Sequence, residues 1–323
     1  MAKNSKKSDV NNAEEAKWLS CIHQVTESAK ADIYIISGGL NRPVDEQLIN
    51  CIKQNKSQPN AILLLTTFGG DADVAYRIAR CFQKSYNEGI FTIFISGVCK
   101  SAGTLVTIGA SELVMTDCAE LGPLDVQFGK PDELGEYISG LTPAHALDFL
   151  KEHTFELFEH CFLSLISRSG YQITTKTAAE IATKLTDGVF HPVYAQLDPF
   201  KLGEYHRNMK IAAEYGKRLM ATGNLKSEDS LIKLTHGYPS HGFVIDKKEA
   251  EDLYNKIRQP NDNEIEMAER LKPVIYSELH KTPAAVHYIK PPTQEQLVAL
   301  NPSPEPKGDQ TNEKASGTNM QST

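Results

Sequence analysis

Four short apolar runs in the first half of the chain are each bounded by polar residues or glycine. They cover residues 32–37, 61–66, 91–95 and 112–116. Their continuous apolar character is typical of strands that are buried on both faces of a parallel sheet. Residues 44–53 and 72–86 carry apolar side chains at helical spacing, and residues 102–110 form a short run of small apolar residues. Alternating strands and helices predict right-handed βαβ units and hence an α/β fold.

The rest of the chain shows mainly helical patterns. They predict helices over residues 144–166, 177–185, 204–221, 227–234, 248–257 and 263–280, with one more over 12–27. We expect Asp187 and Gly188 to stop the helix at 177–185, before an extended segment over 189–196. A short strand is expected over 123–127, and a turn followed by a strand over 238–246.

Composition distinguishes the two ends of the chain from its centre. Residues 1–12 are polar, and residues 301–323 are rich in Pro, Gly, Ser and Asn, with Met320 as their single large apolar side chain. Segments of this kind bury too little apolar surface to fold, so we expect both to be disordered. Between them we expect one domain over residues 13–258 and a helical C-terminal extension over residues 259–300.

The charge and cysteine content exclude several functions. A net charge of −7 argues against nucleic-acid and anionic-membrane binding, because both require a basic surface. The apolar runs are too short for a transmembrane segment, and no apolar stretch follows the basic N-terminus as it would in a secretion signal. The six cysteines form no C-x-x-C pair, and we expect free thiols in the cytoplasm.

The sequence contains no motif for a metal or an organic cofactor. Neither a Walker P-loop nor an H-E-x-x-H motif occurs. His145, His153 and His160 share one predicted helix, but no set of carboxylates accompanies them. We interpret these histidines as part of an exposed helix face and expect no bound metal or cofactor.

Two strand–helix junctions carry the candidate chemistry. Gly69 and Gly70 follow the strand at 61–66, and Ser101 and Ala102 follow the strand at 91–95. Glycine lets the chain bend tightly and leaves amide groups open to an oxyanion, while a serine at a helix N-terminus lies at the sheet edge where α/β proteins bind ligands. We interpret Ser101 as a nucleophile and the amides of Gly69, Gly70 and Ala102 as an oxyanion hole. A plain glycine turn and a serine N-cap are the alternative readings.

These junctions and the segments around them resemble the Clp-protease/crotonase superfamily. The residues concerned are Phe68-Gly-Gly-Asp71, Ser96-Gly-Val-Cys-Lys-Ser-Ala-Gly-Thr-Leu105 and Leu121-Gly-Pro-Leu-Asp-Val-Gln127. Within the superfamily, residues 32–257 are most similar to the serine dehydrogenase proteinase group, which is related to signal peptide peptidase A. The resemblance implies a β-β-α superhelix, a serine peptidase with Ser101 as its nucleophile, peptide or protein substrates, and a homo-oligomer.

The resemblance leaves the general base open. Clp peptidases have a histidine in the segment that here contains Leu124 and Asp125, whereas signal peptide peptidases use a lysine at about the distance of Lys151. His241 is the other candidate base, with Asp125 to orient it, because a histidine titrates near neutral pH without tuning. A lysine base must first be desolvated. The alternatives are a structural histidine at 241 and a solvated helix lysine at 151.

Two other functions remain open at this point. The same fold hosts acyl-CoA hydratases and hydrolases, which would use the oxyanion hole for a thioester and Asp125 as a carboxylate. The second alternative is a catalytically silent interaction module. Binding to immobilised CoA would favour the first, and labelling of Ser101 by a fluorophosphonate would exclude the second.

Overall fold

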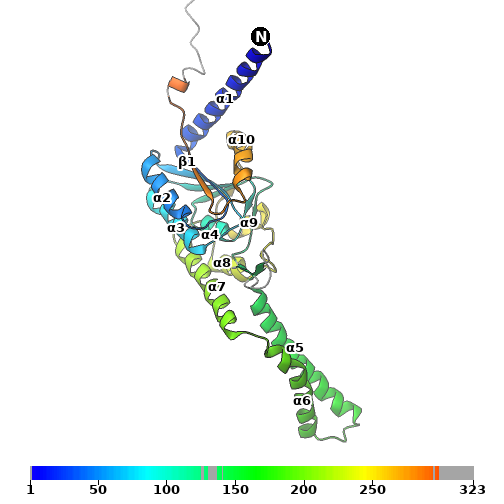
Figure 1. Ribbon diagram of the computed structural model, residues 1–323. Coiled ribbons are helices and arrows are strands. Elements are labelled where there is room, and N and C mark those ends of the chain that lie inside the picture. Colours follow the sequence, from blue (N-terminus) through cyan, green and yellow to red (C-terminus); the bar gives the residue numbers. More distant parts are fainter. Residues whose placement is uncertain (1, 125–126, 130–136, 140, 294, 298–323) are drawn as a thin grey trace, which may run out of the picture.

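The computed structural model describes residues 2–124, 127–129, 137–139, 141–293 and 295–297. It contains a core of strands and helices from which helical segments project at opposite ends (Figure 1). Within the described residues, no helix combines the length and apolar character that crossing a membrane requires.

A six-stranded sheet forms the centre of the core, in the order β10-β1-β2-β3-β5-β9. Its strands are β1 (Ala31–Ser37), β2 (Asn60–Thr66), β3 (Phe91–Ile95), β5 (Glu112–Met115), β9 (Ile257–Arg258) and β10 (Ala285–Ile289). Neighbouring strands pair in parallel, except that β10 is antiparallel to β1. The predicted α/β class with a mostly parallel sheet is confirmed.

Helices cover both faces of this sheet, which explains the uninterrupted apolar runs. The helices on one face include α2 (Val44–Asn55), α3 (Ala72–Ser85), α4 (Ala102–Ile108), α8 (Glu228–His236) and α9 (Lys247–Leu253), and those on the other are α1 (Ala2–Ala29) and α10 (Asp262–Glu278). In β2, Leu63 and Leu65 belong to the first hydrophobic cluster, while Ile62 and Leu64 belong to the second. A strand turns successive side chains to opposite faces, so both sets must be apolar.

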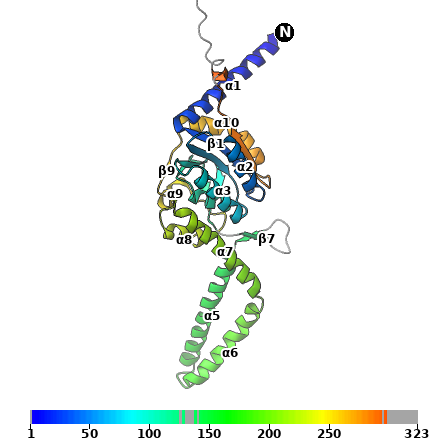
Figure 2. The same ribbon diagram turned by 90° about the vertical axis from the view of Figure 1, so that its left-hand side faces the viewer.

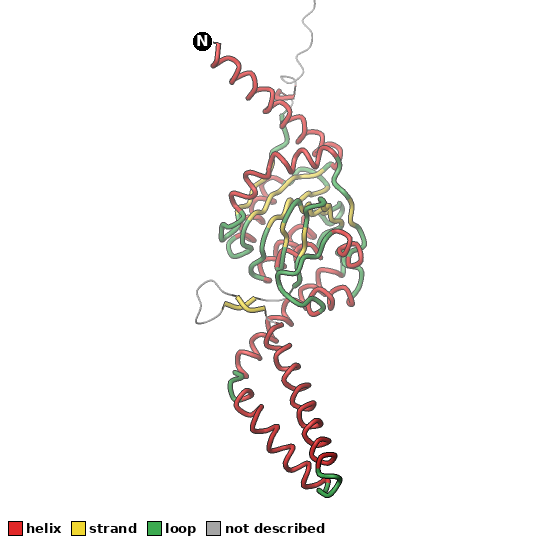
Figure 3. The backbone as a smooth tube through the Cα atoms, turned by 90° about the vertical axis from the view of Figure 1, so that its right-hand side faces the viewer, coloured by secondary structure: helices red, strands yellow, loops and turns green. Residues whose placement is uncertain are grey.

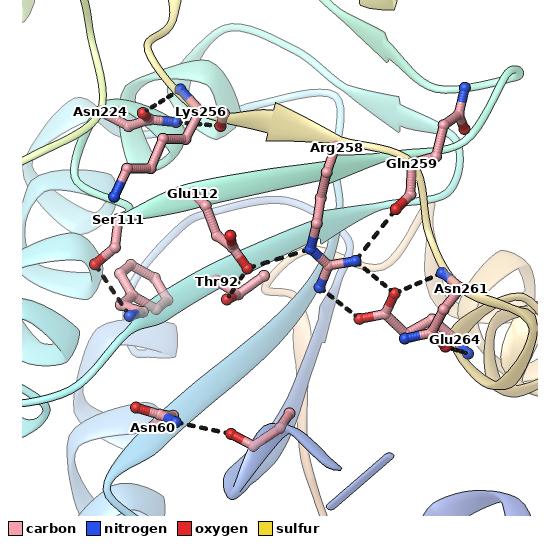
Figure 4. A network of polar contacts seen from close by, with 12 residues as sticks. Asn60, Thr92, Ser111, Glu112, Asn224, Lys256, Arg258, Gln259, Asn261 and Glu264 are labelled. Atoms are coloured by element: carbon pink, nitrogen blue, oxygen red, sulfur yellow. Dashed lines mark hydrogen bonds and ion pairs between the residues drawn. The ribbon is translucent and has the colours of Figure 1, made fainter. Parts of the chain in front are cut away.

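The C-terminal part of the chain belongs to this core. Met267, Leu271 and Ile275 of α10 are buried against the sheet, and β10 pairs with β1 from Ile33↔Ile289 to Ser37↔Ala285. Figure 4 shows a polar network that connects α10 to β9, the strand at the other edge of the sheet from β10. There the Arg258 guanidinium donates to both Glu264 carboxylate oxygens at 2.7 Å and contacts Glu112 of β5 at 3.4 Å.

Three local predictions differ from the structure. The expected stop at Asp187 and Gly188 and the extended segment at 189–196 are wrong, because α6 (Thr175–Tyr194) continues through them with Pro192 inside. Proline removes one backbone donor, so the Gly188 carbonyl loses its helical partner, and because Gly188 is exposed water can bond to that carbonyl instead. Helix α1 begins at Ala2, before the expected start at residue 12. Residues 123–124 are not a strand, and residues 125–126 lie outside the described residues.

Two long helices project from the core as an arm. They are α5 (Leu141–Arg168) and α6 (Thr175–Tyr194), and α7 (Pro199–Met220) leads from them back to the core. Figures 2 and 3 show the two helices joined by a short connection at the far end of the arm. Two small sheets complete the fold: β4 (Val98–Cys99) pairs with β6 (Glu120–Leu121), and β7 (Gln127–Gly129) pairs with β8 (Tyr137–Ser139).

Candidate functional site

The two glycines after β2 adopt backbone conformations that favour glycine. Gly69 has φ 119° and Gly70 has φ 147°. A Cβ atom on Gly70 would lie 2.6 Å from the Leu40 carbonyl oxygen, and one on Gly69 would lie 2.7 Å from the Ser101 Cβ atom. Glycine is therefore required at both positions by backbone conformation and by space. The same contact places the Gly69 turn directly beside Ser101, as the sequence predicts.

Ser101 has a strained backbone at the start of α4. Its φ of 52° and ψ of −118° are rare for a residue with a side chain, and its hydroxyl makes no capping hydrogen bond to the helix. Asp71, at the start of α3, shows what an ordinary N-cap looks like: its backbone is extended and its carboxylate accepts from the Asp73 amide at 3.1 Å. The N-cap interpretation thus applies to Asp71 and fails for Ser101.

Some backbone amides around Ser101 already donate hydrogen bonds within the protein, and others remain available to a substrate. The Gly69 amide donates to Thr67 Oγ1 at 2.9 Å, and the Asp71 amide donates to the Leu40 carbonyl at 2.8 Å. Among the described residues, the amides of Gly70 and Ala102 meet no hydrogen-bond acceptor within the protein. Gly69 therefore supplies space rather than a donor, and the predicted oxyanion hole reduces to Gly70 and Ala102.

A cavity of about 870 Å³ opens at this edge of the sheet. Ser101, Gly70 and Ala102 line it, and so does His241, which lies in the segment between α8 and α9. That segment forms a turn, but its predicted strand is reduced to a single bridge between Ile245 and Leu121. The structure therefore brings Ser101 and His241 to one cavity although they are far apart in the sequence.

His280 lines the same cavity and was not predicted. Its ring stacks on Phe68, with 5.7 Å between ring centroids, and both side chains are exposed. His280 follows α10, and α10 is brought to the site by packing against the far side of the sheet. Nothing in the local sequence indicates this approach, so only the tertiary structure could reveal it.

The two residues before Ser101 do not line the cavity. The Lys100 side chain is 13% exposed, and its Nζ donates to the Gly242 carbonyl at 3.1 Å and lies 3.4 Å from a Glu120 carboxylate oxygen. Cys99 is completely buried, and this burial raises the pKa of its thiol, so it is not a competing nucleophile. Of residues 99–101, Ser101 is the one that lines the cavity.

Two other predicted site residues are not placed with Ser101. Lys151 lies on α5 in the arm, where it lines a separate cavity and its Nζ is 3.7 Å from an Asp148 carboxylate oxygen. Its side chain is 65% exposed, so burial does not favour a neutral amine there. Asp125, the predicted orienting carboxylate, lies outside the described residues. Within those residues, no group of three or more His, Cys, Asp or Glu side chains is arranged to hold a metal.

Comparison with known proteins gives weak similarities. No protein-family model and no curated protein matches the chain. Among solved structures, a serine-to-alanine mutant of the 1510-N membrane-bound stomatin-specific protease matches with 22% identity, 48% of this chain and 72% of that chain covered, and a TM-score of 0.29. A lysine-to-alanine mutant of the same protease in complex with a substrate peptide matches with 20% identity, coverages of 76% and 99%, and a TM-score of 0.30. TM-scores this low assign neither a fold nor an activity to this chain.

Proposed function

We propose that this chain is a serine peptidase with the Clp/crotonase-like β-β-α superhelix, Ser101 as its nucleophile and His241 as its general base. The observation that carries the proposal is the backbone of Ser101. A positive φ at a strand–helix turn costs roughly 1–3 kcal/mol for a non-glycine residue, and such strain is concentrated at active sites. The strain has no capping function here, and it holds the serine where it lines the cavity.

The available amides fit the charge that develops in acyl transfer. In the proposed reaction, Ser101 Oγ attacks the carbonyl carbon of a peptide bond while His241 accepts the hydroxyl proton. The amides of Gly70 and Ala102 donate to the resulting oxyanion. His241 then gives the proton to the departing amine, and a water molecule hydrolyses the acyl-enzyme by the same steps in reverse order.

His241 is preferred over Lys151 because it shares the cavity of Ser101. The six cysteines are free thiols, which supports the reducing cytoplasm as the compartment of the enzyme.

The proposal is tested on the full chain with a fluorophosphonate probe and a fluorogenic peptide library. We expect the wild type to be labelled at Ser101 and the Ser101→Ala variant to lose both labelling and hydrolysis, by at least about 10³-fold in rate. The matched control is Ser277→Ala, an exposed serine of α10, which should keep both. A folded wild type that is neither labelled nor active on any peptide would refute the proposal, and activity on acyl-CoA thioesters alone would replace it.

A further inference from the structure

Two exposed rings lie against each other at the candidate site. Phe68 is 51% exposed, and its ring stacks on the His280 imidazole with 5.7 Å between centroids and 25° between the ring planes. Both residues line the cavity that contains Ser101. Phe68 directly precedes Gly69, which lies beside Ser101. The pair therefore presents a flat surface in the same cavity as the proposed nucleophile.

This pair contributes little to the packing of the core. Neither Phe68 nor His280 belongs to either of the two hydrophobic clusters. In the part of the chain that the structure describes, the His280 ring contacts Phe68 and makes no hydrogen bond or ion pair. Ligand cavities are typically lined by aromatic side chains with a few polar groups among them, so a role in ligand binding accounts for this exposed pair.

The charged side chains of this cavity are acidic. Of the described residues that line it, Asp71 and Asp73 are carboxylates and none is Lys or Arg. Asp71 accepts a hydrogen bond from the Asp73 amide at 3.1 Å, and Asp73 accepts one from the Tyr215 hydroxyl at 2.8 Å. Both carboxylates are exposed, and neither forms an ion pair with another described residue. The cavity therefore favours a cationic ligand over an anionic one.

We propose, resting on the peptidase function proposed above, that Phe68 and His280 form a subsite for an arginine side chain of the substrate peptide. A guanidinium group is planar and cationic, so it stacks on an aromatic face while its N–H groups donate to carboxylates. Phe68 supplies the face, and Asp71 and Asp73 supply the acceptors. Lysine has the charge without the plane, and a substrate phenylalanine has the plane without the charge. Arginine alone uses both features of the cavity.

The position of the subsite relative to Ser101 is fixed by one short turn. Phe68 and Asp71 flank Gly69 and Gly70, whose backbone conformations and close contacts admit no side chain. The stack on His280 also restricts the Phe68 ring before a ligand arrives, which lowers the entropy that binding costs. We therefore expect arginine to be preferred at one position of the peptide rather than at every position.

Binding is measured by fluorescence anisotropy with the full-length Ser101→Ala variant, so that no cleavage occurs. The ligands are labelled hexapeptides of Ala and Ser with one Arg at each position in turn. Matched peptides carry citrulline, which is uncharged and similar in shape, or Lys or Phe instead. At one position we expect Arg to bind at least about 10-fold more tightly than citrulline, with Lys between them. Ser101→Gly provides a second inactive background if circular dichroism shows the alanine variant to be unfolded.

Two substitutions test the two features separately. Phe68→Leu removes the aromatic face, and Asp71→Asn removes a charge but keeps an N-cap side chain, so each should reduce the preference for Arg by about 3- to 10-fold. The control for the first is Phe149→Leu, because Phe149 is 56% exposed and also stacks on a histidine, but does not line this cavity. The control for the second is Asp229→Asn on α8, which changes the net charge equally.

Three results would overturn the proposal. These are Arg peptides that bind no more tightly than their citrulline counterparts at any position, a preference for Phe over Arg, and an Arg preference that Phe68→Leu and Asp71→Asn both leave unchanged. The peptidase function is tested separately by labelling of Ser101. An Arg preference in a protein whose Ser101 is never labelled would support the subsite and count against the peptidase.

Discussion

At the scale of single residues, the site depends on a serine held in a conformation that suits glycine. With φ 52° and ψ −118°, Ser101 stores strain that the neighbouring turns must hold in place. The absence of a side chain at Gly69 is part of this arrangement, since a Cβ atom there would collide with Ser101. Function and stability therefore compete at this position.

This competition predicts that the Gly variant is more stable than the Ala variant at Ser101, the reverse of the order in a regular helix. Glycine adopts the observed φ and ψ without a Cβ penalty, so Ser101→Gly should be about 1–2 kcal/mol more stable than Ser101→Ala, although both lack the proposed nucleophile. At Ser277, in the regular helix α10, alanine should instead be the more stable by about 1 kcal/mol. Urea denaturation of the four variants measures both differences. If Ser101→Ala is at least as stable as Ser101→Gly, the strained conformation does not exist in solution.

Sequence reasoning proposed this residue, the glycine pair and two candidate bases, but it could not tell which amides are available or that His280 approaches the site. The glycine pair and the serine are each local signals, since each follows a buried strand closely. Which amide is available depends on Thr67 Oγ1 and the Leu40 carbonyl, and the approach of His280 depends on α10. Such contacts are set by tertiary packing and leave no periodic pattern.

At the scale of elements, contacts with several parts of the core hold the segment that carries His241. Its ends are fixed by α8, by α9 and by the Ile245–Leu121 bridge, whose two hydrogen bonds measure 2.9 and 3.0 Å. Near His241 itself, Lys100 donates to the Gly242 carbonyl, and the aliphatic part of Lys100 packs against Gly122. The residue before Ser101 thus helps to hold the segment that carries the proposed base.

We expect Lys100→Met to slow acylation of Ser101 by roughly 10- to 100-fold, because a catalytic group displaced by about 1 Å loses much of its effect. The measurement is the rate of fluorophosphonate labelling against pH. A misplaced His241 should weaken the dependence of the labelling rate on pH, whereas a general loss of stability would not change the shape of that profile. Lys100→Arg should recover part of the rate, and Glu120→Gln, which keeps the Gly242 hydrogen bond, should lose less than Lys100→Met. An unchanged rate and profile in Lys100→Met would show that Lys100 does not position the base.

The elements themselves were largely predictable, and the exceptions have physical causes. Residues 61–66 and 72–86 are read correctly because burial imposes continuous apolar character on the strand and helical spacing on the helix. Pro192 misleads because water can bond to the exposed Gly188 carbonyl that loses its helical donor, so the helix continues to Tyr194. Strand β10 is missed because its five residues are only partly buried, and its pairing with β1 comes from the opposite end of the chain.

At the scale of the whole molecule, the C-terminal part of the chain completes the core. The sequence suggests a domain that ends at residue 258, followed by a helical extension. In the structure, α10 covers one face of the sheet and β10 covers the free edge of β1. The link between these two elements also reaches the candidate site, because His280 and Thr282 lie between α10 and β10 and line the cavity.

We therefore predict that a chain ending at residue 258 does not fold into an active domain. Removing Met267, Leu271 and Ile275 exposes the apolar face formed by Ile33 and Ile35, among others, and each lost buried side chain costs about 1.5–3 kcal/mol. Together with the unpaired edge of β1, this loss approaches the roughly 5–15 kcal/mol that stabilises a typical protein. A chain ending at residue 300 keeps α10 and β10 and is the control. Thermal unfolding followed by circular dichroism, with dye binding to exposed apolar surface, should show a cooperative transition for the control alone. A cooperative transition in the shorter chain, within a few degrees of the control, would mean that residues 259–300 are an appendage rather than part of the domain.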